Sequence, residues 1–193
     1  DDNTVQYCVP LVESLADAAI RIVITSGDQH KTLESCETIW SSLLKSGADR
    51  ESLILNVGGG MICDLGGFAA SCYQRGIRFA HIPTSLLAMA DAAMGGKTGV
   101  NYGGYKNYIG RFEAPSFIWT DPIFLKTLPR QEILDGLAEI VKHAIIGSRE
   151  LWETISTFER LESIDWHTLL ELNIPVKLHI SDIDPFEKGI RKT

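Results

Sequence analysis

The side chains best suited to chemistry lie between Gly136 and His143, where acidic, basic and imidazole groups recur at helical spacing. Glu139 and Lys142 are three residues apart, and Glu139 and His143 are four apart, so both pairs share one face of a helix. A carboxylate and an imidazole on one face can bind a metal ion. A solvated salt-bridge face has the same spacing, so the spacing alone leaves both interpretations open.

A glycine triplet, Gly58-Gly59-Gly60, follows an apolar run and precedes a helical pattern, with Asp64 one turn further on. Glycines let a backbone approach a pyrophosphate, and the N-terminus of a helix supplies N–H donors and positive potential. The triplet differs from the G-x-G-x-x-G fingerprint of the common dinucleotide fold. It therefore indicates either a phosphate-binding turn or only a tight connection between a strand and a helix.

A third segment ends in Gly96-Lys97-Thr98, which is similar to the end of a P-loop. The P-loop pattern needs glycine at position 91, where this chain has an aspartate, and a carboxylate there would repel phosphates. We therefore reject a P-loop nucleotide hydrolase. We expect a glycine turn that directs Lys97 into a cleft near Asp91, and a solvated lysine on a surface turn is the alternative.

The first part of the chain alternates between strand and helix patterns. We expect strands at 19–25, 52–57 and 77–82, a possible fourth at 117–120, and helices at 33–44 and 62–72. After Pro122 nearly every pattern is helical: Pro129 suits a first helical turn, and further helices are expected at 148–158 and 168–180. The alternation predicts a parallel α/β sheet, with a domain boundary near 121–128.

Composition limits the partners and the compartment. The formal net charge of −7 argues against a nucleic-acid partner, which needs clustered Lys and Arg. No apolar run approaches the roughly 20 residues of a membrane span, so we expect no membrane partner. Because the chain opens at Asp1 without methionine, we expect an upstream segment to be missing. The cysteines form no C-x-x-C pair, so we expect reduced, packed thiols in a cytoplasmic protein at Cys8, Cys36, Cys63 and Cys72.

Taken in order, the motifs resemble those of the 3-dehydroquinate synthase family of sugar-phosphate cyclases. The resemblance covers nearly the whole chain. The departures are mild, because Ser85 keeps the hydroxyl of the usual threonine. The matching runs are Gly58-Gly59-Gly60-x-x-x-Asp64-x-x-Gly67-Phe68, Arg75-Gly76-Ile77, Ile82-Pro83-Thr84-Ser85-Leu86-Leu87-Ala88, Asp91-x-x-x-Gly95-Gly96-Lys97-Thr98-Gly99-Val100-Asn101, Lys106-Asn107-x-Ile109-Gly110, Thr127-Leu128-Pro129, Gly136-x-Ala138-Glu139-x-x-Lys142 and Asp184-Pro185-Phe186-Glu187-Lys188-Gly189-x-Arg191-Lys192.

The resemblance implies an α/β fold in two parts. A Rossmann-like parallel-sheet NAD-binding domain would occupy residues 1–125, with its first strand missing. The start of an α-helical metal- and substrate-binding domain would occupy 126–193. The implied reaction of the shikimate pathway, in aromatic amino-acid biosynthesis, converts the sugar acid phosphate 3-deoxy-D-arabino-heptulosonate 7-phosphate (DAHP) to 3-dehydroquinate and phosphate. It proceeds by NAD-dependent oxidation, phosphate elimination, reduction and aldol closure, with zinc, or alternatively cobalt, as the metal.

The resemblance also implies individual roles. Glu139 would bind the metal, whereas position 143 is not a ligand in the family pattern, and the remaining ligands are histidines expected beyond Thr193. Arg75 would reach the site of a neighbouring subunit, which implies a homodimer. The substrate pocket would be lined by Arg75, Asp91, Lys97, Asn107, Lys142, Lys177 and Arg191. NAD would be contacted by Asp1, Asp28, Lys31, Gly59, Gly60, Asp64, Thr84, Ser85, Leu87, Lys106, Thr127 and Glu132.

Three alternatives stay open. A sister cyclase that makes a deoxy-inosose or valiolone ring shares most of these motifs, although Lys177 and Arg191 suit a substrate carboxylate and favour the first interpretation. A metal-dependent alcohol dehydrogenase also carries a glycine triplet, but it would leave Gly95-Gly96-Lys97-Thr98 unexplained. An NAD-binding module without a metal site is the non-enzyme alternative.

Overall fold

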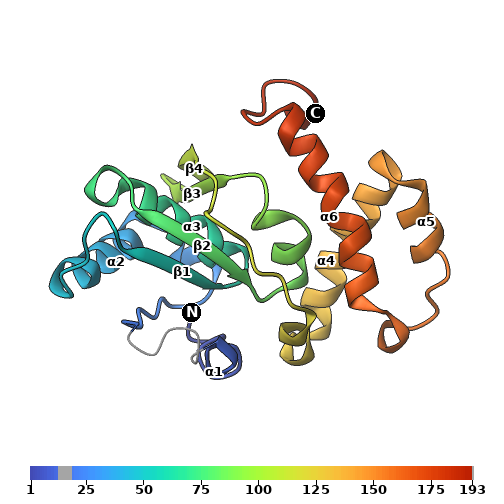
Figure 1. Ribbon diagram of the computed structural model, residues 1–193, viewed down its shortest axis with the longest axis horizontal. Helices are drawn as coiled ribbons and strands as arrows, with labels where there is room; N and C mark the ends of the chain where they lie inside the picture. Colours follow the sequence, from blue (N-terminus) through green and yellow to red (C-terminus); the bar gives the residue numbers. More distant parts are fainter. Residues whose placement is uncertain (13–18, 193) are drawn as a thin grey trace.

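Two parallel strands form the centre of the N-terminal half of this computed structural model, which describes residues 1–12 and 19–192. β1 (Leu53–Gly58) pairs with β2 (Arg78–Pro83) in the register Leu53↔Arg78 to Gly58↔Pro83. α3 (Gly60–Cys72) connects these strands and packs on them, and α2 (Leu33–Lys45) packs on α3 (Figure 1). The predicted parallel pairing and both predicted helices are confirmed.

Two of the predicted strands do not form complete ladders. Residues 117–120 contribute one parallel bridge, His81↔Ile118, at the other edge of β2. The strand predicted at 19–25 is wrong, because the structure assigns no strand to these residues. Ile24 is buried and Ile22 packs beside it. The β-branched, apolar run therefore indicates side chains that enter the core, although the backbone of this segment joins no sheet.

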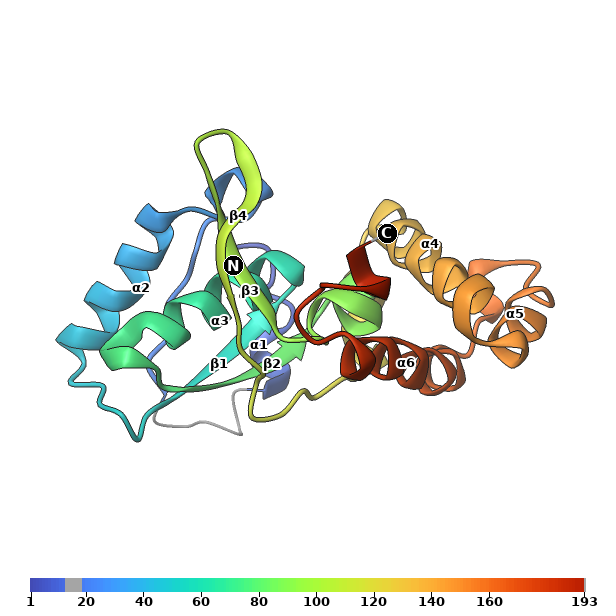
Figure 2. The same cartoon turned by 90° about the horizontal axis from the view of Figure 1, so that it is seen from above.

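An antiparallel hairpin was not predicted. β3 (Lys97–Tyr102) pairs with β4 (Tyr105–Phe112), and the hairpin extends beyond the sheet in Figure 2. Gly103 and Gly104 form its turn with φ values of +59° and +83°. Left-handed backbone at both central positions is the geometry of a tight hairpin turn, and it favours glycine. This Gly-Gly pair was the sequence signal for the hairpin.

The C-terminal half is helical, as predicted. α4 (Arg130–Gly147), α5 (Arg149–Ile155) and α6 (Trp166–Ile183) pack against one another, and short 3₁₀ turns η5 (Pro122–Thr127), η6 (Leu161–Ser163) and η7 (Ile190–Lys192) accompany them (Figure 1). Ser148 caps α5 by accepting the Leu151 N–H, and Asp165 caps α6 by accepting those of His167 and Thr168. The helix predicted at 148–158 ends earlier, at Ile155.

Two hydrophobic cores correspond to these halves. One lies between α2, α3 and the sheet. The other lies among the helices, and it includes Val12 of α1 (Val9–Val12) and Leu86 and Met89, which follow β2. Leu86 lies in the helical turn that leads into the π-helical turn η4 (Ala88–Ala92), Met89 lies in η4 itself, and this segment joins the halves. The α/β class is therefore confirmed, and the domain boundary near 121–128 stays a prediction.

Two expectations from composition can be compared with the structure. Cys8, Cys36 and Cys63 are buried free thiols, but Cys72 is exposed, so the prediction of a packed thiol is wrong for Cys72. Cys72 is the last residue of α3. Its side chain is exposed, although the preceding residue, Ser71, is buried. Among the described residues, no helix is both long and apolar enough to cross a membrane.

Candidate active site

The glycine triplet lies where the carboxyl ends of β1 and β2 meet. The Thr84 N–H donates to the carbonyl of Gly58 at 2.9 Å, which holds the two strand ends together. Gly59 is the N-cap of α3. A Cβ on Gly59 would lie 3.3 Å from Ser85 Oγ, and one on Gly60 would lie 3.0 Å from Ala92 Cβ. The missing side chains leave bare backbone at a helix N-terminus, which fits the pyrophosphate of a dinucleotide.

A buried ion pair lies one turn into α3. Lys31 Nζ binds both Asp64 Oδ2 and Asn107 Oδ1, and the Lys31 side chain is only 4% exposed. Burial raises the pKa of the Asp64 carboxyl above its ordinary value, although the charge of Lys31 opposes this shift. Asn107 has a left-handed backbone, with φ +53°, and its N–H donates to Asn101 Oδ1. We name Lys31, Asp64 and Asn107 the sheet cluster.

The remaining residues assigned to NAD are less closely grouped. Asp28 and Lys106 form an exposed ion pair of 2.9 Å, and this hydrogen bond lowers the pKa of the Asp28 carboxyl. Burial raises the pKa of the Cys8 thiol, although Thr84 and the amino group of Asp1 oppose this shift. Leu87 precedes η4. Thr127 and Glu132 are exposed, at the end of η5 and in the first turn of α4.

A second charged cluster joins η4, α4 and α6. Asp91 of η4 binds Lys177 of α6, and Glu139 of α4 binds Lys142 of the same helix. His143 Nε2 lies 3.5 Å from Asp91 Oδ1 and 3.6 Å from Glu139 Oε1. The predicted shared face of Glu139, Lys142 and His143 is therefore confirmed. We name these five residues the helix cluster.

The helix cluster keeps Asp91 ionised. Burial favours the neutral acid, but the hydrogen bond with His143 and the charge of Lys177 together hold the pKa of Asp91 well below its ordinary range. Gly136 lets α4 come close enough for these contacts. A Cβ on Gly136 would lie 2.6 Å from Leu86 Cβ and 2.7 Å from the Leu87 nitrogen.

The donor set of the helix cluster fits a divalent metal ion. One ligand atom each from Asp91, Glu139 and His143 lies within 4.8 Å of the other two. Carboxylate oxygen and imidazole nitrogen are donors that zinc and similar ions take. Sequence reasoning missed Asn173, which is fully buried beside His143 and accepts its Nδ1–H at 2.8 Å. A single asparagine in an apolar helical pattern carries no signal of such a contact.

Two further cations lie near the glycine turn Gly95-Gly96. Lys97, the first residue of β3, binds Glu187, and the ion pair of Asp91 is formed by Lys177. The placement of Lys97 near Asp91 stays a prediction. Arg191 is held by Asp184, whose carboxylate accepts the Arg191 N–H at 3.0 Å.

The guanidinium of Arg191 packs on the backbone of the same turn. Its Nη2 would lie 3.1 Å from a Cβ on Gly95, where φ is +99°. This Nη2 is buried and has no hydrogen-bond partner among the described residues. A buried guanidinium donor without an acceptor is suited to an anionic ligand.

Arg75 lies apart from both clusters. It is exposed in the turn η3 (Tyr73–Arg75) after α3, where Gln74 and Arg75 have φ values of +48° and +73°. Two hydrogen bonds hold this turn, from Tyr73 Oη at 3.1 Å and Gln74 Nε2 at 3.2 Å to the carbonyl of Ala48. Consecutive left-handed residues other than glycine are strained and often mark functional positions. The role of Arg75 across an interface stays a prediction.

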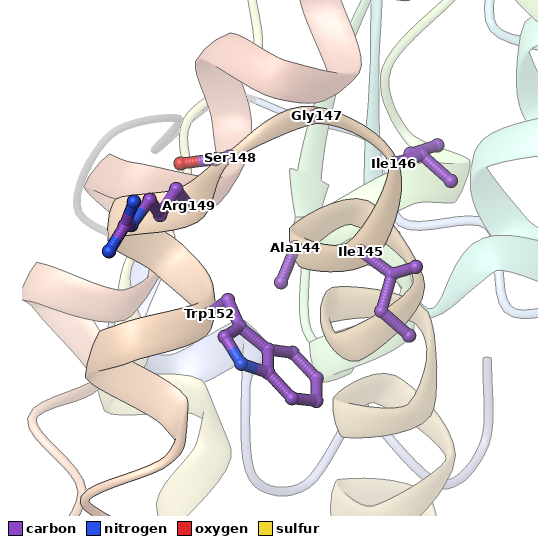
Figure 3. Close-up of a pocket in the computed structure, with 7 residues that line it drawn as sticks. All are labelled: Ala144, Ile145, Ile146, Gly147, Ser148, Arg149 and Trp152. Atoms are coloured by element: carbon purple, nitrogen blue, oxygen red, sulfur yellow. The ribbon is translucent and has the colours of Figure 1, made fainter.

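Two surface hollows lie elsewhere, and none of the predicted site residues lines either one. The first lies at the junction of α4 and α5, where Trp152 projects from α5 towards α4 (Figure 3), and it includes Ile145 and Ile146. The second lies between η5 and the start of α6 and includes Pro122 and Trp166.

Comparison with known families and proteins gives matches to 3-dehydroquinate synthases. The family model described as 3-dehydroquinate synthase N-terminal matches residues 21–135. A 3-dehydroquinate synthase of Parabacteroides distasonis is 43% identical over 197 residues, which cover 100% of this chain and 56% of that protein. The chain thus spans about half the length of the curated relatives it matches.

Two solved structures are also similar. A 2-deoxy-scyllo-inosose synthase complexed with carbaglucose-6-phosphate, NAD⁺ and Co²⁺ has a TM-score of 0.81 and 26% identity, covering 99% of this chain and 54% of that one. A 2-epi-5-epi-valiolone synthase from Streptomyces hygroscopicus, with NAD⁺ and Zn²⁺ bound, has a TM-score of 0.70 and 28% identity, covering 95% and 54%. Both structures hold NAD⁺ and a divalent metal.

Proposed function

The chain belongs to the 3-dehydroquinate synthase family, and from this premise we propose that the protein converts DAHP to 3-dehydroquinate and phosphate. The observation that carries the proposal is the helix cluster, in which Lys177 pairs with Asp91, while Arg191 lies near Lys177 at the turn of Gly95. A sugar acid phosphate has two anionic groups and several hydroxyls. The anionic groups need cations and the hydroxyls need hydrogen-bond acceptors, and the chain supplies both.

The glycine turn and the sheet cluster would hold NAD. Gly59 and Gly60 present bare backbone to the pyrophosphate, and Thr84 and Ser85 lie on the other side of the same strand ends. Asp64 is fixed by Lys31, so its carboxylate is available at a constant position on α3. Bound NAD would supply a reversible hydride acceptor. Asp1, Asp28, Leu87, Lys106, Thr127 and Glu132 complete the proposed set.

The helix cluster would hold the metal through Glu139. A bound divalent ion would act as a Lewis acid on a substrate oxygen. We propose zinc, because the similar valiolone synthase structure holds Zn²⁺, and cobalt is the alternative by the same comparison with the inosose synthase. Asp91 remains ionised beside Lys177, so it is suited to accept a hydrogen bond from a substrate hydroxyl. Such an acceptor orients the substrate next to Glu139.

The cations would hold the substrate anions. Lys177 is nearly buried and stays with Asp91, whereas Lys97 and Lys142 are about half exposed and can exchange a carboxylate partner for a substrate group. Arg191 has a buried Nη2 that finds no hydrogen-bond partner within the described part of the chain. Asn107 offers an amide from the hairpin. Together these residues would form two regions. Lys177 and Arg191 would bind the substrate carboxylate, and the others would bind the remaining polar groups of the substrate.

The test is product analysis with the full-length protein, DAHP, NAD and Zn²⁺. We expect equal amounts of phosphate and 3-dehydroquinate, without net accumulation of NADH, because the overall conversion is redox-neutral. A sister cyclase is the second candidate, favoured by the structural similarity to the inosose synthase. It would instead release phosphate from a hexose phosphate that lacks a carboxylate and leave DAHP unchanged. Lasting NADH formation would contradict both candidates.

We further propose a cytoplasmic homodimer in which Arg75 serves the partner's site. The four unpaired cysteines agree with a reducing compartment. Mixing Arg75→Ala with Glu139→Gln in the full-length protein tests the interface. If Arg75 acts across it, heterodimers hold one intact site, and activity should return to about a quarter of the native value in a symmetric dimer. No recovery after demonstrated subunit exchange would contradict this assignment.

A further inference from the structure

The fully buried side chain of Asn173 connects all three elements of the helix cluster. Asn173 belongs to α6, and its Nδ2 donates to the carbonyl of Ala90 at 3.0 Å, one residue before Asp91 in η4. Its Oδ1 lies 2.8 Å from Nδ1 of His143 in α4. One side chain thus joins the backbone that carries Asp91 to the helix that carries Glu139.

These contacts determine the orientation of the His143 ring. A carbonyl only accepts hydrogen bonds, so the amide nitrogen of Asn173 must face Ala90, and its Oδ1 must face His143. Nδ1 of His143 therefore carries a hydrogen and donates it. The other ring nitrogen, Nε2, is turned towards Asp91 Oδ1 and Glu139 Oε1, at 3.5 and 3.6 Å, and the ring is 2% exposed.

We propose that Asn173 and His143 are positioning residues that fix the carboxylate of Glu139, the proposed ligand of the divalent metal ion, relative to that of Asp91, the proposed acceptor for a substrate hydroxyl. The proposal rests on the proposed function for the identity of the centre. His143 stays outside the ligand set, in agreement with the family pattern, and acts through the two carboxylates it faces. Outer contacts of this kind typically change metal affinity by about 10- to 100-fold when they are removed.

The first test is Asn173→Leu in the full-length protein, which keeps the branched skeleton of the side chain but removes both hydrogen bonds. Calorimetry with Zn²⁺ and the visible absorption of bound Co²⁺ report on the metal centre without relying on turnover. We expect the metal affinity to fall by about 10- to 100-fold. NAD affinity should change less than about twofold, because the glycine turn lies outside this network.

Two substitutions of His143 separate its two ring nitrogens. His143→Asn keeps an amide donor near the position of Nδ1, so the contact with Asn173 and the fold should be retained while metal affinity falls. His143→Gln reaches the position of Nε2 and should keep an affinity closer to the native value. If Asn173→Leu does not fold, this pair decides the question.

Leu151→Ala is the control for a purely structural effect, because Leu151 is fully buried in the same helical core without belonging to the network. It should lower the melting temperature and leave metal affinity unchanged. Folded Asn173→Leu and His143→Asn proteins with native metal affinity would overturn the proposal. Equal losses of metal and NAD affinity in step with stability would also overturn it, because they indicate a structural role alone.

The outcomes separate this proposal from the proposed function. If the native protein converts DAHP and the variants bind metal normally, the positioning role is wrong and the function stands. If the native protein binds Zn²⁺ but leaves DAHP unchanged, and the variants lose metal affinity, the positioning role stands and the function is wrong. A native protein that binds neither Zn²⁺ nor Co²⁺ contradicts both.

Discussion

The sheet cluster and the helix cluster contain similar residue types, but they differ in how completely each group is satisfied. In the sheet cluster one buried lysine, Lys31, binds a single carboxylate and an amide, and its side chain is 4% exposed. In the helix cluster two carboxylates face two lysines and an imidazole nitrogen, and the Lys142 side chain is 53% exposed. The sheet cluster therefore holds its side chains in fixed positions beside a ligand. In the helix cluster the lysines can exchange a carboxylate partner for a ligand group.

This difference predicts where chemistry is most sensitive to substitution. Glu139→Gln keeps the shape of the side chain but removes the charge that faces the metal. Because loss of an outer contact alone costs about 10- to 100-fold, loss of a ligand should lower turnover by at least about 100-fold. Steady-state phosphate release measures this. Glu150→Gln, an exposed acid in the first turn of α5, is the matched control, and equal activity of the two variants would break the comparison.

The free energy of unfolding should be more sensitive to substitution in the sheet cluster than in the helix cluster. Lys31→Met leaves the carboxylate of Asp64 partly buried without its cation, and removing one partner of a buried pair typically costs about 3 to 5 kcal/mol. Lys142→Met removes a half-exposed partner, so the free energy of unfolding should change by less than about 0.5 kcal/mol. Urea denaturation of both variants compares the clusters directly. Similar losses would show that the sheet cluster is no more rigid than the helix cluster.

The sheet half should also lose stability in mild acid. Burial lowers the pKa of His81 to about 4, and its ring, which packs beside Phe79, interacts with the Asn56 amide at 3.3 Å. The unfolded chain therefore binds a proton at higher pH than the folded chain does. Stability contributed by His81 is complete above about pH 6.5 and falls as the pH drops towards 4, by about 3 kcal/mol in total.

The measurement is urea denaturation between pH 7 and pH 4. His81→Phe removes the titrating group and should flatten this part of the pH dependence, although the variant has its own packing cost. A native protein whose free energy of unfolding is constant over that range would contradict the assignment of a neutral, buried ring.

A smaller effect tests how the helices are placed. A methyl group on Gly136 would meet Leu86 Cβ at 2.6 Å and the Leu87 backbone nitrogen at 2.7 Å. Gly136→Ala should therefore displace α4 and cost about 1 to 3 kcal/mol of stability, with a parallel loss of Zn²⁺ affinity. Gly47→Ala is not a suitable control, because Gly47 has φ +75°. Ala138→Ser, an exposed change on the same helix, should leave both quantities unchanged.

The sequence predicted the local part of this arrangement well. Periodicity predicted α2, α3 and the helices after Pro122, and spacing placed Glu139, Lys142 and His143 on one face. These features depend on residues within a few turns of one another. The glycine turn after β1 was predicted for the same reason.

The contacts that complete the site depend on long-range packing, which spacing does not encode. Asp91 and Lys177 are 86 residues apart, and Asn173 is 83 residues from Ala90. The strand expected at 19–25 was wrong because a β-branched, apolar run indicates burial and does not by itself determine strand pairing. The hairpin was missed because Gly103-Gly104 was not weighed as a two-residue turn.

The central claim is that the two clusters serve two different ligands within one site. Calorimetric titration of full-length Asp64→Ala and Glu139→Gln with NAD and with Zn²⁺ tests it most directly. We predict that Asp64→Ala weakens NAD binding and keeps native Zn²⁺ affinity, while Glu139→Gln loses Zn²⁺ binding and keeps native NAD affinity. If both substitutions weaken both ligands equally, or if Asp64→Ala binds NAD with native affinity, the division of roles between the clusters is wrong.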